Sequence, residues 1–442
     1  MSIFKACDIR GIYGKELDEL QAFEIGRAFG TFIDGKNAVV GGDARISTPL
    51  LKEKVIEGLL LSGCDVIDIG IVPTPTFYFA KTYLNIYGGV MVTASHNPSE
   101  YNGFKIAFGD LPVTEEDIKK IENLVKTKNF KQGRGKLIDR FVLNEYENYI
   151  QSFFTSINNS LKVVVDGGNG IAGPTAVNLF RKLNYEVETL FCEPDGTFPN
   201  REPNPAVEKN LEHLKRKVVE VNANFGVAFD GDGDRVAFVD ENGKVIPSEK
   251  IIIIFAKYLF KKYGPGKIIY DHKCSTIVEK EIRKLGGEAV REKSGHAFIK
   301  RSFLQQDAVM AGEISGHYFF KELGGDDGIF SALLMGEIIN TLGKKLSELA
   351  NEIPNYYITP DIRIAYPYDK EKLFEMVKKE FSVYTIDTLD GVRVIFPNGW
   401  GLIRLSVTEP IITMRFEGDT PEDLIKIKEL FKEKIPTLKE LI

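Results

Sequence analysis

Short apolar runs alternate with amphipathic segments through most of the chain. Runs rich in valine, isoleucine and phenylalanine, such as Val66–Ile71, residues 163–165 and Phe225–Phe229, predict buried strands. Between such runs, apolar residues recur at the spacing of one helix face, as at Leu51, Val55, Ile56 and Leu59. Strands that alternate with helices indicate α/β layers with loops at the strand ends.

The same alternation occurs three times before the last part of the chain. Further strands are predicted at residues 37–40, 89–92, 236–239, 244–246, 267–270, 288–291 and 308–311. A helix is predicted from about Pro174, and the sequence Glu241-Asn242-Gly243 predicts a hairpin turn. Three similar α/β units indicate a repeated architecture, although no repeat is visible residue by residue.

The pattern changes from about Asn355. The sequence there predicts strands at residues 361–365, Val392–Phe396, 402–407 and 411–416, with helices near 370–381 and Pro421–Lys434. This order is typical of an α+β domain built on an antiparallel sheet. We therefore predict an α/β protein with three similar α/β domains with mixed sheets (1–150, 151–246 and 247–354) and a smaller C-terminal α+β domain (355–442).

Composition is typical of soluble globular proteins. Of the 442 residues, 43% are hydrophobic and 27% are charged, and the net charge of −6 argues against a nucleic-acid partner. The longest apolar run, residues 251–255, is far shorter than the roughly 20 residues of a membrane helix. With no secretory leader visible, we predict a cytoplasmic protein without a membrane partner. The scattered cysteines are predicted to be buried free thiols: Cys7, Cys64, Cys192 and Cys274.

An acidic loop follows the predicted strand Phe225–Phe229. Asp230, Asp232 and Asp234 alternate with glycines, and three such close carboxylates repel one another unless a cation collects them. The glycines let the backbone curl so that the carboxylates converge. Ligands that are all oxygen favour magnesium, calcium or manganese over zinc.

Two other interpretations of the acidic loop are weaker. An EF-hand would use Glu241 as its twelfth residue, but it needs glycine where Arg235 stands. Its flanks would also be helices, whereas strands are predicted here. A solvated acidic turn is the second alternative.

A serine stands at another predicted strand end, in the sequence T-A-S-H-N-P of residues 93–98. Small residues present the hydroxyl of Ser95, and Asn-Pro fixes the turn. Lys105 follows closely and could bring a cation to the same place. A turn serine is more often a capping or hydrogen-bonding residue, so this loop by itself leaves both roles open.

Two more loops carry polar residues suited to a sugar phosphate. In G-E-I-S-G-H (312–317), an extended backbone would aim Glu313, Ser315 and His317 the same way, as a row for sugar hydroxyls. In R-L-S-V-T-E-P (404–410), which Arg415 follows, an arginine and two hydroxyl residues can cradle a phosphate. The alternatives are a solvated strand face and an ordinary β-turn.

These loops, in this order, resemble the α-D-phosphohexomutase family over essentially the whole chain. F-K-A-C-D-I-R-G (4–11) resembles its N-terminal segment, T-A-S-H-N-P its phosphoserine loop and D-G-D-G-D-R its metal loop. G-E-I-S-G-H resembles its sugar loop, and R-L-S-V-T-E-P its phosphate loop. K-S-G-H-A-F-I-K (293–300) and F-F-K-E (319–322) are most similar to the bifunctional phosphomannomutase/phosphoglucomutase branch. The resemblance implies four domains around a central cleft, with one loop from each.

The resemblance also implies an enzyme that interconverts hexose 1-phosphate and hexose 6-phosphate, of mannose or glucose, through phosphorylated Ser95 and a hexose 1,6-bisphosphate. It implies Mg²⁺ held by Ser95, Asp230, Asp232 and Asp234. Its candidates for proton transfer are Lys105, His317 and Arg10. Its candidates for substrate binding are Arg235, Lys293, His296, Glu313, Ser315, His317, Arg404, Ser406, Thr408 and Arg415, with His96 and Asn97 as further active-site residues. The expected partners are small hexose phosphates, and the expected assembly is a monomer or homodimer.

The chain departs from the family pattern at two places. Cys7 stands where an aromatic residue is common, so no substrate role is carried over to it, and Val407 stands where glycine or asparagine is usual. The main alternative within the family is a phosphoglucosamine or phospho-acetylglucosamine mutase, although the glucosamine branch tends to carry Gln where Ile314 stands.

Two alternatives lie outside the family's activity. A phosphatase with an aspartyl nucleophile would leave the serine, sugar and phosphate loops without a role. A non-catalytic sugar-phosphate-binding protein would be expected to have lost Ser95 or one of the three aspartates.

Overall fold

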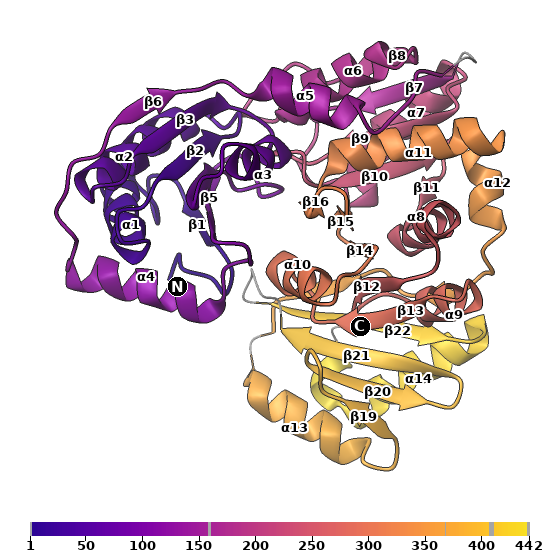
Figure 1. Cartoon of the computed structure of the whole chain (residues 1–442). Helices are drawn as coiled ribbons and strands as arrows, with labels where there is room; N and C mark the ends of the chain where they lie inside the picture. The colour runs from indigo at the N-terminus through magenta and orange to yellow at the C-terminus, as the bar shows by residue number, and fades with distance from the viewer. Residues whose placement is uncertain (1, 158–160, 367, 406–410, 440–442) are drawn as a thin grey trace.

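The computed structural model describes residues 2–157, 161–366, 368–405 and 411–439, which form four units around a central cavity (Figure 1). The first unit contains β1 (Ile9–Ile12), α1 (Glu19–Phe32), β2 (Ala38–Gly42), α2 (Thr48–Leu61), β3 (Val66–Ile71), α3 (Thr74–Tyr83), β4 (Gly88–Val92), β5 (Tyr101–Phe108), α4 (Glu115–Thr127) and β6 (Leu137–Asp139). Its sheet has the order β1-β5-β4-β2-β3-β6. Strands β4, β2, β3 and β6 are parallel, whereas β5 pairs antiparallel with both β4 and β1.

The second and third units repeat one topology. The second contains α5 (Leu143–Gln151), β7 (Lys162–Asp166), α6 (Ala172–Lys182), β8 (Glu186–Leu190), η1 (Glu208–Leu211), α7 (Glu212–Glu220), β9 (Phe225–Phe229), β10 (Val236–Asp240) and β11 (Val245–Ile246). The third contains α8 (Ser248–Tyr263), β12 (Lys267–Asp271), α9 (Thr276–Lys284), β13 (Glu288–Glu292), α10 (His296–Gln305), β14 (Met310–Gly312), β15 (Tyr318–Phe320), β16 (Gly325–Asp326), α11 (Gly328–Leu342) and α12 (Leu346–Asn351). Each sheet joins three parallel strands to two antiparallel ones, in the orders β8-β7-β9-β10-β11 and β13-β12-β14-β15-β16.

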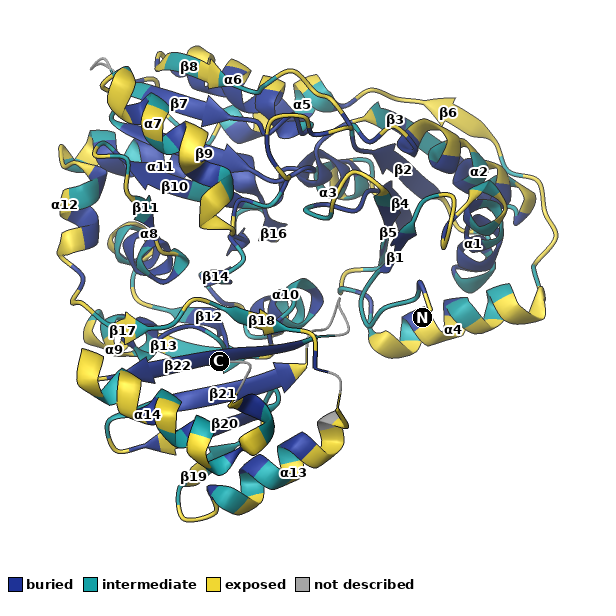
Figure 2. Cartoon of the chain, turned by 180° about the vertical axis from the view of Figure 1, so that it is seen from behind, coloured by how far each residue is buried: buried dark blue, intermediate teal, exposed yellow. Residues whose placement is uncertain are grey.

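The fourth unit is built on an antiparallel sheet. It contains β17 (Tyr357–Ile358), β18 (Ile362–Ile364), α13 (Lys370–Glu380), β19 (Thr385–Asp387), β20 (Val392–Phe396), β21 (Gly399–Leu405), β22 (Ile412–Gly418), α14 (Pro421–Lys434) and η2 (Pro436–Leu438). The sheet order is β17-β22-β21-β20-β19, and β18 also pairs with β22. The predicted fold class is therefore confirmed, and Figure 2 shows buried β21 and β22 beside the more exposed α13.

The second and third units share one apolar core. Phe180 and Phe229 of the second unit belong to the same buried cluster as Phe255 and Phe320 of the third. Tyr146, on α5, also packs in this cluster, so α5 packs with the second unit although most of the helix lies before the predicted boundary at residue 150. The first and fourth units have separate cores.

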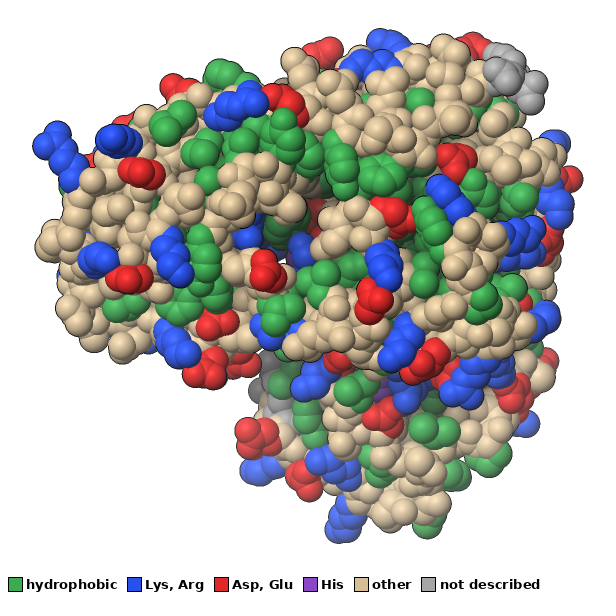
Figure 3. All heavy atoms as spheres, in the orientation of Figure 1, with side chains coloured by type: hydrophobic (Ala, Val, Ile, Leu, Met, Phe, Trp, Pro, Cys, Tyr) green, Lys and Arg blue, Asp and Glu red, His purple; other side chains and the backbone are tan. Residues whose placement is uncertain are grey.

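The surface carries charges of both signs (Figure 3), and the cysteines form no disulfides, as the sequence predicted. Acidic and basic side chains are intermixed over the face drawn in Figure 3. None of the helices among the described residues is long and apolar enough to cross a membrane. All four cysteines are free thiols; Cys64 and Cys274 are buried, and Cys7 and Cys192 are partly buried.

Helices α1 and α2 approach so closely that Gly58 is needed at their contact. A Cβ at Gly58 would collide with the carbonyl oxygen of Phe23 and lie 2.7 Å from the backbone nitrogen of Arg27. Both of these atoms belong to the backbone of α1, so they cannot move aside without shifting the helix.

We expect Gly58→Ala to destabilise the first unit by about 1–3 kcal/mol, because the added methyl overpacks the contact between the helices. Thermal unfolding followed by circular dichroism should show the lower midpoint. Glu57→Ala, on the exposed face of the same helix, should change the midpoint much less, since its ion pair with Lys54 is exposed. Equal midpoints for the two variants would contradict the prediction.

Candidate active site

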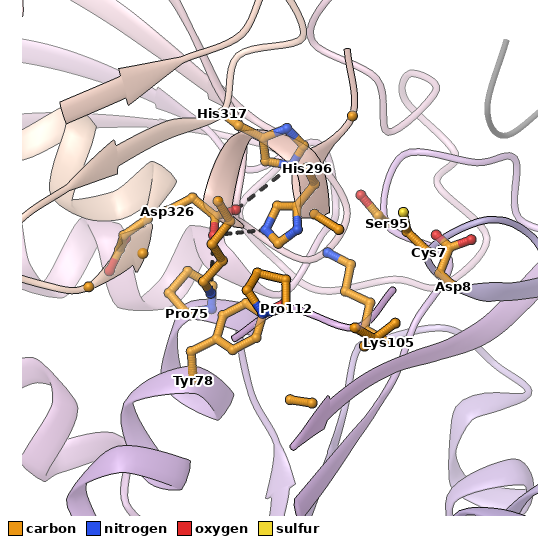
Figure 4. A pocket seen from close by; sticks show the side chains of 18 of the residues that line it. Cys7, Asp8, Pro75, Tyr78, Ser95, Lys105, Pro112, His296, His317 and Asp326 are labelled. Atoms are coloured by element: carbon orange, nitrogen blue, oxygen red, sulfur yellow. Dashed lines mark hydrogen bonds and ion pairs between the residues drawn. The ribbon is translucent and has the colours of Figure 1, made fainter. Parts of the chain in front are cut away.

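The four units enclose a cavity of about 660 Å³, which opens at the recess visible in Figure 3 and is drawn from close by in Figure 4. Its lining includes many of the residues predicted from sequence: Arg10, Ser95, His96, Lys105, Arg235, His296, Glu313, Ser315, His317 and Arg404. The three aspartates of the acidic loop are fully buried against Ser95 and Lys105. The cavity thus gathers side chains from all four units.

Ser95 lies in the loop after β4, in an unusual backbone conformation. Its φ is +50°, a value that a non-glycine residue keeps only when its surroundings fix it. The residue is 1% exposed, and its Oγ donates to Oδ2 of Asp230 at 2.7 Å. Nδ1 of His96 lies 3.3 Å from the same Oγ. A hydroxyl fixed between a carboxylate and an imidazole is suited to act as a nucleophile.

The backbone of the serine loop is held by Arg45, which the sequence analysis did not assign to the site. This buried guanidinium donates to the carbonyl oxygens of Ser95 at 2.8 Å and of Asn97 and Pro98 at 2.6 Å. Asp43 accepts from its Nε at 3.2 Å. The position of Arg45 in the sequence could have indicated this role. Arg45 follows β2 and Ser95 follows the parallel strand β4, and the carboxyl ends of neighbouring parallel strands meet at one sheet edge.

Arg10 holds the same loop from β1. Its Nη1 donates to Oδ1 of Asn97 at 2.6 Å and to the carbonyl oxygen of Ala94 at 3.2 Å. Its Nε lies 2.8 Å from Oδ2 of Asp8. Arg10 and Arg45 therefore fix the backbone of the serine loop. The side chain of Asn97 is the point at which Arg10 holds it.

The acidic loop joins β9 to β10, so its flanks are strands and the EF-hand interpretation does not apply. One carboxylate oxygen from each aspartate lies within 4.8 Å of the others: Asp230, Asp232 and Asp234. Gly231 allows the loop to touch the serine loop, because a Cβ there would lie 2.5 Å from the carbonyl oxygen of Ser95. The predicted convergence of the carboxylates is thus present.

The donor set of this loop fits a divalent cation such as Mg²⁺. Oδ2 of Asp232 accepts from the hydroxyls of Thr74 at 2.7 Å and Thr93 at 3.2 Å. Its Oδ1 is buried and has no hydrogen-bond partner among the described residues. Carboxylate and hydroxyl oxygens are the ligands that hard cations prefer. The residues present therefore suit the ion implied by the family resemblance.

The charge of Lys105 in the first unit interacts strongly with the aspartates of the acidic loop in the second unit. Burial and the negative charges of Asp232 and Asp234 raise the pKa of Asp230 well above its ordinary value. Burial alone would lower the pKa of Lys105, but Asp232 and Asp234 outweigh it and raise that pKa well above its ordinary value. Nζ of Lys105 lies 2.8 Å from Oδ2 of Asp232 and also contacts Asp234. Lys105 is therefore a permanent cation at the acidic loop.

The loop at residues 312–317 is not extended, so the strand alternation considered for it is wrong. Strand β14 ends at Gly312, and a turn follows in which the nitrogen of Gly316 donates to the carbonyl oxygen of Glu313. Gly316 has a φ of +93°, which a regular strand does not use. The turn nevertheless places Glu313, Ser315 and His317 on the cavity, with Oγ of Ser315 3.1 Å from Nδ1 of His317.

Burial changes the proton affinity of two of these groups in opposite senses. Burial, followed by the negative charge of Asp271, raises the pKa of Glu313 to about 8. Burial lowers the pKa of His317 to about 4, although the opposite charge of Asp234 acts against it. At neutral pH the Glu313 carboxyl keeps a proton that it can donate, and the His317 ring is neutral.

Arg404 brings a guanidinium to the cavity from β21. Its Nε donates to Oδ2 of Asp390 at 2.7 Å, while its buried Nη2 has no hydrogen-bond partner among the described residues. A guanidinium held at one nitrogen and free at another can bind an anion. Ser406, Val407 and Thr408 of the predicted phosphate cradle lie outside the described residues.

Two residues predicted to bind substrate do not line the cavity. Arg415 donates to Oε1 of Glu249 at 2.8 Å and to the carbonyl oxygen of Lys273 at 2.7 Å, and so joins β22 to the third unit. Lys293 is exposed, with its Nζ 6.0 Å from the ring centroid of Phe298. A buried carboxylate that sequence reasoning missed, Asp326, instead contacts His296 at 2.9 Å.

Comparison with known proteins agrees with this architecture. Family models for phosphoglucomutase/phosphomannomutase match the chain in four consecutive parts: the α/β/α domains I, II and III at residues 1–132, 144–243 and 247–357, and the C-terminal domain at 364–434. The predicted bounds of the domains stay predictions.

Curated relatives match nearly the whole chain. A phosphomannomutase/phosphoglucomutase of Pseudomonas putida is 40% identical over 439 residues, covering 98% of this chain and 95% of that protein. A probable phosphoglucosamine mutase of Pyrococcus abyssi is 36% identical over 430 residues, covering 95% of this chain and 94% of that protein.

A solved structure is similar throughout. The crystal structure of a phosphoglucomutase/phosphomannomutase family protein from Burkholderia thailandensis matches with a TM-score of 0.91 and 36% identity, covering 99% of this chain and 97% of that one. Four domain models in order, relatives at full length and this shared fold show that the chain belongs to the phosphoglucomutase/phosphomannomutase family, as its sequence predicted.

Proposed function

We propose that this chain moves a phosphoryl group between O1 and O6 of a hexose phosphate through phosphorylated Ser95 and a hexose 1,6-bisphosphate, with Mg²⁺ as cofactor. The broader function, a hexose phosphate mutase and hence an isomerase, follows from membership of the family. One observation carries the finer proposal. Oγ of Ser95 donates a hydrogen bond to Oδ2 of Asp230 at 2.7 Å, beside a cavity that Arg404 of the last unit also lines.

The cation is proposed to sit at the acidic loop. Ser95, Asp230, Asp232 and Asp234 would hold it, since their oxygens converge there. When bound, a divalent cation neutralises charge on the phosphoryl group that is transferred. Lys105 adds a fixed positive charge from β5 and thereby keeps the repelling carboxylates together.

The transfer exchanges one phosphorus–oxygen bond for another. A sugar hydroxyl attacks the phosphorus on Ser95, a bond forms to the sugar oxygen, and the bond to Oγ breaks. The hydroxyl proton passes to a base, and the reverse transfer later returns the other phosphoryl group to the serine. Lys105, His317 and Arg10 are the proposed candidates for moving this proton, because all three line the cavity. The neutral ring of His317 can accept the proton, whereas the protonated Lys105 can only donate one.

The bisphosphate must present each of its two ends to Ser95 in turn. In both orientations a non-reacting phosphate lies at the far side of the cavity, where Arg404 is proposed to bind it. Glu313 and Ser315 are proposed to bind O3 and O4, which look similar in the two orientations. Arg235 and His296 also line the cavity and are proposed to contact the substrate, while Ser406 and Thr408 remain proposed from sequence.

Mannose and glucose phosphates are the proposed substrates, because relatives at 40% identity carry both activities in their names. Glucosamine phosphate is the second candidate, supported by the name of the Pyrococcus abyssi relative. Turnover of the three 1-phosphates, measured side by side with a bisphosphate activator, decides between them. The cytoplasmic location and the monomeric or homodimeric state stay predictions.

Ser95→Ala should remove the phosphorylated form of the protein and reduce turnover by at least about 10³-fold, because alanine has no hydroxyl to carry the phosphoryl group. Intact mass and peptide mapping test for one phosphate at Ser95. Ser315→Ala, changed in the same cavity, should keep that phosphate. Full activity in the Ser95 variant would rule out the mechanism.

Asp232→Asn should weaken magnesium binding and turnover by about tenfold or more, since it removes one of three converging charges. Activity titrated with Mg²⁺ after chelator treatment measures both effects. Glu241→Gln is the matched control: this carboxylate accepts from Ser347 outside the loop and would matter only in an EF-hand. Full turnover without any divalent ion would refute a catalytic metal site.

Arg404→Ala should lower kcat/KM about 10–100-fold, because a charge-assisted contact to phosphate contributes roughly 1.5–3 kcal/mol. The loss should be similar for 1-phosphate and 6-phosphate substrates, since one cradle serves both orientations. More bisphosphate should escape per turnover, whereas phosphate transfer from a bisphosphate to Ser95 should remain detectable.

Arg404→Lys provides the comparison for this test, because it keeps the charge and loses the forked geometry. Its loss should be intermediate. An effect restricted to one direction of the reaction, or unchanged efficiency in the alanine variant, would show that Arg404 does not hold the far phosphate.

A further inference from the structure

A buried carboxylate lies between the two histidines of the central cavity. Asp326 ends β16 and is 3% exposed. Its Oδ1 lies 2.9 Å from Nε2 of His296, and its Oδ2 lies 3.9 Å from Nε2 of His317. Figure 4 shows the Asp326 side chain turned toward both rings, with a dashed line to each.

We propose that Asp326 is a positioning residue of the mutase reaction, which fixes the ring of His296 so that this imidazole meets the sugar phosphate in one arrangement. The proposal rests on the proposed function of this cavity. Asp326 acts through His296 and needs no contact with the substrate.

The contacts of His296 show why such a residue is needed. His296 begins α10, and its ring lies edge-on to His317, with centroids 5.2 Å apart. On another side it faces Tyr78 of α3, in a stacked arrangement with centroids 6.2 Å apart. Ring contacts of this kind do not distinguish the two flipped orientations of an imidazole, whereas an anionic acceptor selects one orientation and places the proton on the bonded nitrogen.

The surroundings keep Asp326 ionised. Burial would raise its pKa, but the hydrogen-bonded contact with His296 and the positive charge of Lys300 outweigh that effect and lower the pKa to about 2. Nζ of Lys300 lies 3.9 Å from Oδ1 of Asp326 and 3.7 Å from the ring centroid of Tyr78. A carboxylate in this setting is a permanent acceptor, so it can hold the same ring orientation throughout the catalytic cycle.

A metal centre is the competing interpretation of this cluster. Asp234, His317 and Asp326 each place one possible ligand atom within 4.8 Å of the others. However, Nε of Arg235 donates to Nε2 of His317 at 3.3 Å and so occupies the lone pair that a metal would need. Lys300 already compensates the charge of Asp326. The set therefore favours fixed hydrogen bonds over a bound ion.

The chain offers a matched control in the next residue. Asp327 is equally buried, but its Oδ1 accepts from the nitrogen of Phe330 at the start of α11, and its Oδ2 accepts from the hydroxyl of Tyr146. Asp327→Asn therefore changes a neighbouring buried carboxylate that holds a helix end. Asp326→Asn changes the carboxylate that holds His296.

The test combines ring spectroscopy with kinetics. The chain has only five histidines, so protein labelled with ¹⁵N-histidine gives a small set of ring signals that His→Gln variants can assign. In Asp326→Asn we expect the ring nitrogens of His296 to shift, while those of the exposed His213 stay unchanged. We expect kcat/KM for hexose phosphate to fall about 10–100-fold, as for other residues that orient an active-site imidazole. Asp327→Asn should leave the His296 signals in place.

Unchanged His296 signals in Asp326→Asn, or a loss of kcat/KM no larger than in Asp327→Asn, would overturn the proposal. If the asparagine variant does not fold, Asp326→Glu displaces the carboxylate oxygens with the charge kept, and the same shift is expected. A wild-type protein that interconverts no hexose phosphate would refute the proposed function, whereas the ring signals would still test the contact between Asp326 and His296.

Discussion

The repulsion among three buried carboxylates is the constraint on which the rest of this structure depends. Asp230, Asp232 and Asp234 are fully buried on the second unit, and groups of the first unit compensate them. Lys105 supplies the charge, and the hydroxyl of Thr74 donates to the carboxylate of Asp232, while its backbone nitrogen donates to the carbonyl oxygen of the same residue. Because charge compensation crosses from one unit to the other, the acidic loop also fixes how the first two units meet.

The two sides of the cavity are joined by different kinds of interaction. The second and third units share an apolar core, which makes one continuous base for the acidic loop and for the turn before His317. The fourth unit has its own core and meets the third through polar contacts. Glu417 accepts from Thr276 at the start of α9, and Arg415 pairs with Glu249. Arg404 thus stands on a unit attached by charge and hydrogen bonds, the kind of interface that rearranges more readily than an apolar core.

Buried arginines in this protein serve two separate purposes, and the partners of their N–H donors distinguish them. The N–H groups of Arg45 donate to three carbonyl oxygens of the serine loop, and those of Arg415 donate to Glu249 and to a backbone carbonyl oxygen. Arg404 keeps a buried nitrogen without a partner among the described residues, beside the cavity. An unsatisfied buried donor costs free energy, so its presence marks a place where a ligand anion can compensate it.

The sequence by itself determined the strands, the loops at their ends, the family and the set of carboxylates beside Ser95. The strands and loops depend on local periodicity and on turn residues, which are readable without knowing what packs against them. The family and the grouping of the carboxylates with Ser95 came from the resemblance of the loop sequences to a known family. Only the tertiary structure brought Arg45 to the serine loop, placed Asp326 between two histidines and turned Arg415 toward Glu249. Each of those contacts pairs a buried charge with a partner distant in the chain, and the choice of partner depends on which unit covers it.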